Sequence, residues 1–218
     1  MSKLTRKVVF EAADAFQLEG RVLDAQPYGG GHINDTFAVE CKRVEGGIKR
    51  YILQRINTRV FQNPIALMGN IVGVTTYLGN LIRKNGGDAI RETLTVIPTQ
   101  DDQFWYRDSE GGYWRCYHFI EDTLTYNQVE NKNDFYHSAR AFGRFQQMLA
   151  DYPAETLHET IPDFHNTVDR FAKFKEAVEK DVCGRVGSVA REIEFAVSRE
   201  RDTHLLIDLQ KAGKLPLR

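Results

Sequence analysis

A change of hydrophobic periodicity near residue 120 most constrains the fold of this chain. Before it, short apolar segments alternate with turn residues, and Phe37, Val39 and Cys41 occupy every second position of one segment. That two-residue period is typical of a half-buried β-strand. After it, apolar residues recur every three or four positions, which is typical of helices. The sequence therefore predicts an α+β chain, with a β-rich region at 1–120 and a helical region at 121–218.

Turn residues divide the β-rich region into strands and one helix. Asn63 and Pro64 suit a helix start. An Asn side chain can accept a hydrogen bond from a free backbone N–H of the first turn, and proline fits the first helical position because the N–H that it lacks is not needed there. Asn85-Gly86-Gly87 suits the end of the same helix. We therefore expect a helix at 64–84 and strands at 20–28, 35–44, 51–56, 91–98, 103–108 and 113–120.

Asparagines also mark helix starts in the region 121–218. Asn133 precedes a segment in which Phe135 and Phe142 keep helical spacing, and Asn166 precedes another such segment. We expect helices to begin at these two asparagines. A third helix is expected at 188–212, with a break near residue 202.

Composition excludes several classes of function. The 42% of hydrophobic residues suffice for a folded core. With 29 basic and 30 acidic residues, the net charge of −1 gives no electrostatic basis for binding nucleic acid or an anionic membrane. We expect no membrane span, no signal peptide, and three reduced, mostly buried cysteines. The predicted location is cytoplasmic.

The glycine run between the first two strands is the first candidate site. Glycine permits backbone conformations closed to other residues and lets a ligand approach closely. Backbone N–H groups in such a loop can hold phosphate oxygens. A flexible hairpin turn explains a glycine run equally well. The candidate phosphate-binding residues are Gly29, Gly30, Gly31, His32, Asn34, Asp35 and Thr36.

The third strand is the second candidate, because kinases place a cation there to hold the phosphates. Arg55 carries the only charge in this strand, whereas Gln54 lies on the opposite face and can form hydrogen bonds only. A solvated strand residue is the alternative interpretation of Arg55. The helix at 64–84 contains no glutamate that could pair with such a cation. Both Gln54 and Arg55 remain candidates.

Two further segments could bind ligands. In the segment 119–122, a strand runs into a linker, where Phe119, Ile120 and Glu121 could hold a base through backbone hydrogen bonds. The neighbouring His118 is expected to pack rather than to catalyse. In the loop 161–167, a sugar or alcohol could contact Asp163, His165 and Asn166. A capping turn for the following helix is at least as good an interpretation of that loop.

Several catalytic motifs are absent from the sequence. It contains no His-x-Asp-x4-Asn loop, no Asp-x-Asp pair and no Cys-x-Pro-x-Arg motif. Gly-x-Ser-x-Gly and His-Glu-x-x-His are absent too. We therefore assign no catalytic residue and no metal ligand within residues 1–218.

Residues 30–37, 51–58 and 114–123 together resemble the aminoglycoside phosphotransferase and choline kinase superfamily. The likeness is greatest to its N-acetylhexosamine 1-kinase branch and extends over 142–146 and 161–167. It implies a protein-kinase-like fold, with an antiparallel sheet and one helix in an N-lobe, followed by the first helices of an incomplete helical C-lobe. It also implies ATP and Mg²⁺ as cofactors, and transfer of the γ-phosphoryl group to a hydroxyl of an N-acetylhexosamine or related sugar.

The resemblance aligns Gln54 with the phosphate-binding cation of the family and makes 119–122 the hinge between lobes. Residues 214–218 resemble the short strand that precedes the family's catalytic loop. On that basis the catalytic and metal-binding residues are expected beyond Arg218, and the chain alone is expected to be inactive, with association possible through an uncovered face. Alternatives are a non-catalytic kinase-like scaffold, or a kinase for choline, homoserine or an aminoglycoside. The lack of a strong acidic cluster favours a neutral sugar.

Overall fold

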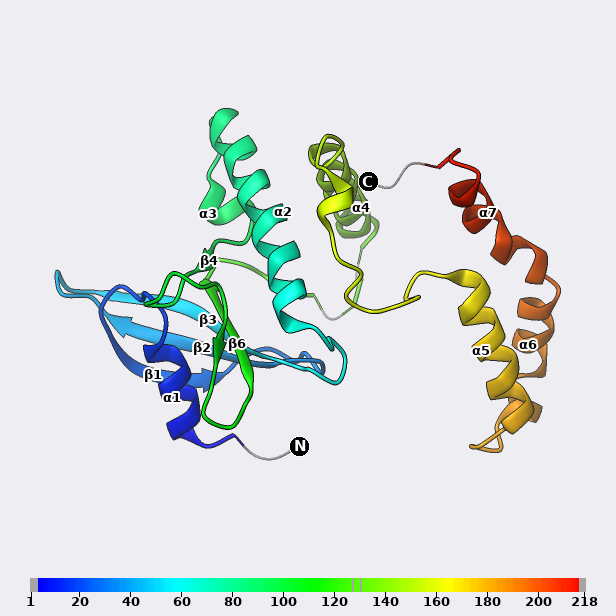
Figure 1. Ribbon diagram of the computed structural model, residues 1–218, viewed down its shortest axis with the longest axis horizontal. Coiled ribbons are helices and arrows are strands. Elements are labelled where there is room, and N and C mark those ends of the chain that lie inside the picture. The colour runs from blue at the N-terminus through cyan, green and yellow to red at the C-terminus, as the bar shows by residue number, and fades with distance from the viewer. Residues whose placement is uncertain (1–3, 127, 130, 216–218) are drawn as a thin grey trace. The chain divides into compact units, whose positions relative to one another are not determined.

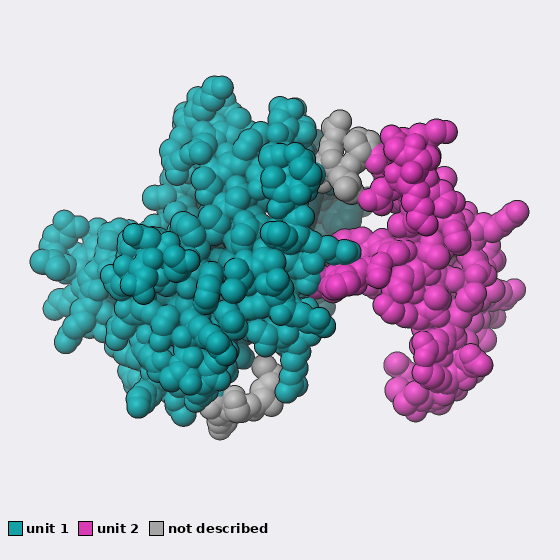
Figure 2. All heavy atoms as spheres, in the orientation of Figure 1, with its two compact units in different colours: residues 1–160, 218 teal, residues 161–217 magenta. Residues whose placement is uncertain are grey.

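The computed structural model describes residues 4–126, 128–129 and 131–215. The chain divides between Thr160 and Ile161 into two compact units (Figure 2). Among the described residues, the last strand ends at His118, and every later helix or strand assignment is helical. The change from strands to helices therefore falls where the periodicity predicts it, whereas the compact units divide about forty residues later.

The first unit contains a six-stranded antiparallel sheet, which confirms the α+β class (Figure 1). Five strands follow the order β1-β2-β3-β6-β4, and β5 pairs with β6. The short hairpins between β1, β2 and β3 give neighbouring strands opposite directions. The strands are β1 (Arg21–Pro27), β2 (Asp35–Lys42), β3 (Ile48–Ile56), β4 (Val96–Ile97), β5 (Tyr106–Arg107) and β6 (Tyr113–His118).

One face of the sheet packs against helix α1 (Arg6–Asp14). Val9 and Ala12 of this helix lie in one buried cluster with Tyr51, Leu53 and Trp114 of the sheet. Trp114 is fully buried, and burial of such a side chain contributes several kcal/mol, on the order of 3–5 by its removal. This face is the main hydrophobic core of the first unit.

The opposite face packs against helix α2 (Pro64–Lys84), whose bounds match the prediction. The side chain of Asn63 caps it by accepting a hydrogen bond from the Ala66 N–H at 3.0 Å. Leu67 and Met68 pack against Ile56 of β3. By length and composition alone α2 could also cross a membrane, so the sequence does hold one apolar run of that size. Core helices pass the same test, and the absence of a membrane span stays a prediction.

The remaining helices refine the expected pattern. Helix α3 (Ala89–Glu92), capped by Asp88, occupies part of the predicted strand 91–98, which was too long. Asn131 rather than Asn133 caps the next helix. The helix expected at 188–212 is divided into several shorter helices and not broken only once near residue 202. The predicted cap at Asn166 is confirmed. The helices are α4 (Lys132–Met148), η1 (Ala154–Thr156), α5 (Thr167–Lys180), η2 (Val186–Val189), α6 (Ala190–Val197), η3 (Glu200–His204) and α7 (Leu205–Lys211).

All three cysteines are free thiols. Cys41 and Cys116 are buried in the sheet, and Cys183 is exposed in the second unit. Burial raises the pKa of the Cys41 thiol to about 11. The prediction of mostly buried cysteines is confirmed, and their reduced state stays a prediction.

Candidate functional site

The glycine loop connects β1 to β2 and is open to solvent. Its ends are joined by the Tyr28 N–H, which donates to the Thr36 carbonyl oxygen at 2.9 Å. Gly29 has a φ of +79°, which other residues rarely adopt. Gly30 and Gly31 have no positive φ, and a Cβ at either position would meet nothing within 4 Å. The packing of the fold therefore does not require glycine at these two positions.

The second half of the loop is fixed to the end of β3. The Asn57 N–H donates to Oδ1 of Asn34, and Nδ2 of Asn57 donates to the Ile33 carbonyl oxygen, both at 3.0 Å. Asp35 begins β2 and lies opposite Arg55. His32 is exposed on the loop. Asn34 thus has a structural partner, while the glycines before it stay uncovered.

Thr36, Gln54 and Arg115 form a row across three adjacent strands. Thr36 lies opposite Gln54 in the β2–β3 pair, and Gln54 lies opposite Arg115 in the β3–β6 pair. Directly opposed residues project from the same face of a sheet. Nε2 of Gln54 donates to Oγ1 of Thr36 at 2.9 Å, and Oε1 of Gln54 accepts from Nε and Nη2 of Arg115 at 3.0 and 2.8 Å. Both ends of the Gln54 amide are therefore engaged.

Arg55 lies on the other face of β3, the face that α1 covers. Its guanidinium is near two carboxylates, at 3.7 Å from Asp108 and 3.8 Å from Glu110. A Cβ at Gly112 would come within 2.3 Å of Nε of Arg55, so glycine is needed there to admit this side chain. The two neighbouring carboxylates already compensate the charge of Arg55.

The linker after β6 is held by side chains from two other elements. Arg50 of β3 lies over the Phe119 ring at 4.0 Å and pairs with the Glu121 carboxylate. Nη1 of Arg91 donates to the Glu121 carbonyl oxygen at 2.8 Å. The hydrogen bond from Arg50 lowers the pKa of Glu121. No hydrogen bond from the backbone N–H of Ile120 or Glu121 is formed to any residue that the structure describes.

Two aromatic contacts complete this part of the sheet. The Tyr28 ring meets Phe119 edge-on, with 5.3 Å between the ring centroids, so the start of the glycine loop contacts the linker. His118 stacks on Tyr51 at 5.4 Å and is half-buried. Burial, and next the charge of Lys49, lower the pKa of His118. These contacts agree with a packing role for His118.

In the second unit, the loop 161–167 forms a capping turn. Oδ1 of Asn166 accepts from the Asp169 N–H at 3.2 Å, at the start of α5. Nδ2 of Asn166 donates to Oδ1 of Asp163 at 3.0 Å, and Asp163 has a φ of +57°. His165 is exposed and lies edge-on to Phe164. The turn explains Asn166 and Asp163 locally, and a substrate contact by these residues stays a prediction.

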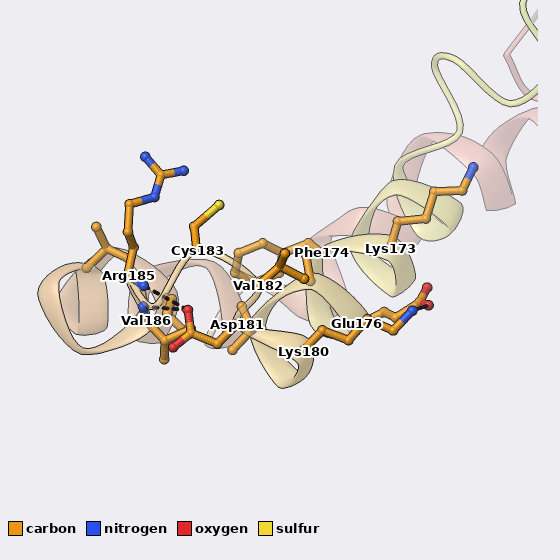
Figure 3. A pocket seen from close by; sticks show the side chains of 13 residues that line it. Lys173, Phe174, Glu176, Lys180, Asp181, Val182, Cys183, Arg185 and Val186 are labelled. Carbon is orange, nitrogen blue, oxygen red and sulfur yellow. Dashed lines mark hydrogen bonds and ion pairs between the residues drawn. The ribbon is translucent and has the colours of Figure 1, made fainter.

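A groove of about 640 Å³ also lies in the second unit (Figure 3). Phe174 and Val182 give it an apolar wall. Asp181 shapes one end by accepting hydrogen bonds from the N–H groups of Arg185 and Val186, at 2.8 and 3.2 Å. None of the residues that the sequence predicts as site residues lines this groove.

Arg115 was not predicted as a site residue from the sequence, although it joins Gln54 and Thr36 in one row. The only signal in the sequence was a charge between the buried residues Trp114 and Cys116 of a strand. Over residues 4–126, 128–129 and 131–215, no group of three or more His, Cys, Asp or Glu side chains is placed to hold a metal ion. No known family model matches the sequence.

Proposed function

We propose that this chain supplies the nucleotide-binding part of an ATP-dependent small-molecule phosphotransferase with a protein-kinase-like fold. The glycine loop between β1 and β2 carries the proposal. Two of its glycines are not needed for packing or for a positive φ, yet their uncovered backbone leaves room that a side chain would fill. Binding of a ligand that approaches the backbone closely, such as a phosphate chain, would explain why both positions are glycine.

The linker supports the same proposal. Protein-kinase-like enzymes hold adenine by backbone hydrogen bonds where a strand leaves the sheet. Here Ile120 and Glu121 have backbone N–H groups with no bond to the described residues, and the segment lies beside Tyr28 at the start of the loop. The antiparallel sheet with one long helix after β3 suits an N-lobe. We assign nucleotide binding to these residues, and no Mg²⁺ ligand.

The acceptor in this proposal is a hydroxyl of an N-acetylhexosamine or related sugar, on the basis of the resemblance described above. Calorimetric titration of N-acetylhexosamines into the chain tests the acceptor. With ADP and Mg²⁺ already present, the measured heat reports the binding of the sugar and not that of the nucleotide. Binding of choline, homoserine or an aminoglycoside in place of the sugar would select the other kinase classes.

Titration calorimetry with ATP and ADP tests the nucleotide. The wild-type chain should bind both, and at 100 times Kd the ligand should stabilise the fold by about 2.7 kcal/mol. Gly30→Val should weaken binding by about tenfold or more, about 1.4 kcal/mol, because its side chain would occupy the space of the ligand. Gly187→Val is the matched control, since a Cβ there also meets nothing within 4 Å. Equal affinities for the two variants would contradict the assignment of the loop.

A non-catalytic scaffold is the second candidate, favoured by one observation. Helix α4 exposes large apolar side chains, with Phe135 66% and Phe142 69% exposed. Uncovered apolar surface of this kind marks interaction sites. If the chain is a scaffold, no nucleotide should stabilise its fold, and the chain should self-associate to a degree that depends on protein concentration. The kinase proposal predicts stabilisation by ATP at any protein concentration.

A further inference from the structure

We propose that Arg115 of β6, aligned by Gln54 of β3, is the cation that binds the phosphates of the nucleotide. This inference rests on the proposed function and names a phosphate-binding residue for it. In this arrangement β3 contributes no cation that binds the phosphates. Gln54 instead presents a neutral amide that orients Arg115. Arg115 comes from β6, which pairs with β3 in the sheet (Figure 1).

The charge of Arg115 is not compensated by any carboxylate in the described part of the chain. Its guanidinium is half-buried, and its described hydrogen bonds are to the neutral amide oxygen of Gln54. Arg115 forms no ion pair with any carboxylate in the described residues. A partly desolvated cation is costly without an anion. Arg55 on the opposite face, by contrast, lies near Asp108 and Glu110.

Arg115 also has a hydrogen-bond donor that the described residues do not use. Nε and Nη2 are held by Gln54, but Nη1 donates to no described protein atom. Nη1 is also not among the buried side-chain nitrogens that lack a partner, so it reaches solvent. Guanidinium groups bind phosphate oxygens through charge-assisted hydrogen bonds, often two at a time. Burial lowers the pKa of Arg115, in agreement with a site that lacks a counter-ion.

The position of Arg115 relative to the glycine loop suits a phosphate chain. Thr36, which closes the loop with Tyr28, belongs to the same row as Gln54 and Arg115. Adjacent strands lie about 4.8 Å apart, so Thr36 and Arg115 are separated by about 10 Å at the backbone. The side chains of the row bridge that distance through Gln54. A chain of two or three phosphates can therefore contact the loop and Arg115 together.

The same geometry gives Gln54 a positioning role. A lysine at position 54 would place a second cation against Arg115 and would offer it no acceptor. A glutamate would keep the size and the acceptor but would neutralise the guanidinium. Gln54 is the residue that can align Arg115 through its oxygen, bond Thr36 through its nitrogen, and leave the positive charge available.

The test measures the affinities of ATP, inorganic triphosphate and adenosine for the wild-type chain and for four variants, Arg115→Gln, Gln54→Glu, Arg107→Gln and Arg55→Gln. Arg115→Gln should weaken ATP and triphosphate binding by about 10- to 100-fold, the range for hydrogen bonds to charged groups, and leave adenosine binding unchanged. Gln54→Glu should weaken ATP binding by about tenfold without lowering the melting temperature, because it gains an ion pair with Arg115. Arg107→Gln, at an exposed cation of β5, is the control and should change ATP affinity by less than about twofold.

The outcomes separate this inference from the proposed function. Failure of the wild-type chain to bind ATP and ADP would overturn both. Normal ATP affinity of Arg115→Gln, with loss in Gly30→Val, would overturn the role of Arg115 and keep the nucleotide site. If Arg115→Gln does not fold, Gln54→Glu decides, since unchanged ATP affinity in that variant would refute the inference. Loss of ATP binding in Arg55→Gln alone would assign the phosphates to the other face.

Discussion

Replacement of Asp108 by Asn should destabilise the first unit strongly, although it only replaces one carboxylate oxygen by an NH₂ group. The carboxylate is fully buried. Its Oδ1 accepts from the N–H groups of Glu110 and Gly112, at 2.9 and 2.6 Å, and its Oδ2 accepts from Nε1 of Trp114 at 2.6 Å. Oδ2 also lies 3.7 Å from Arg55. Both oxygens of Asp108 therefore face donors only.

The size of the effect follows from these contacts. An asparagine can keep its oxygen toward one group of donors, and its NH₂ then faces the other group. One hydrogen bond to a charged acceptor is lost, worth about 1.5–3 kcal/mol, and a buried donor remains without an acceptor at about 1–3 kcal/mol. Because the two losses overlap, we expect the free energy of unfolding to fall by about 2–4 kcal/mol. Glu110→Ala removes only a half-exposed partner of Arg55 and should cost less than about 1 kcal/mol.

Urea unfolding followed by tryptophan fluorescence measures this difference. The sequence has two tryptophans, Trp105 and Trp114, and both lie in the first unit, so the signal reports on that unit. The midpoint should shift without a change of slope. An Asp108→Asn variant within about 0.5 kcal/mol of wild type, or equal to Glu110→Ala, would refute the contact-based reasoning.

Two further predictions concern the same unit. Gly20→Ala should lower the free energy of unfolding by about 1–3 kcal/mol, because φ at this position is +104° and the new Cβ would lie 2.2 Å from the Lys42 carbonyl oxygen. A urea midpoint equal to that of the wild type would contradict this prediction. His118 should make stability depend on pH. The pKa of His118 is lowered in the folded state, so as pH falls below 6.5 the unfolded chain takes up a proton before the folded chain does. The free energy of unfolding is therefore highest above pH 6.5 and decreases as pH falls through the lower pKa of the folded state. His118→Gln should give a flatter stability curve below pH 6.5, and identical curves would contradict the assignment.

Local signals predicted the fold best where they were unambiguous. Asn63, Pro64 and Gly86 lie at both ends of α2, and its bounds match the prediction. The predicted cap at Asn133 was wrong by two positions, because Asn131 is the same type of residue and its side chain accepts from the Asp134 N–H. Helix α1 was missed because Thr5 forms no side-chain cap and the helix depends on burial against the sheet.

The candidate site was less predictable, because it depends on pairing between distant strands. The sequence alone left Gln54 and Arg55 as alternatives for one role. The register of β3 against β6 places Arg115, 61 residues later, beside Gln54. Asp108, which follows β5, comes near Arg55 through the turn that joins β5 to β6. No local pattern encodes those contacts, since strand register is determined by the whole sheet.

The anchored linker after β6 has a consequence for the entropy of binding. Arg50 binds the Glu121 carboxylate, and Arg91 binds the Glu121 carbonyl oxygen. The Phe119 ring is held by Tyr28, which meets it edge-on, and by Arg50, which lies over it. A loop of free residues would lose about 1–2 kcal/mol of conformational entropy per residue when a ligand ordered it. This segment is ordered in advance by its neighbours in the first unit. A flat ring that hydrogen-bonds to its backbone would therefore keep most of its interaction free energy as affinity.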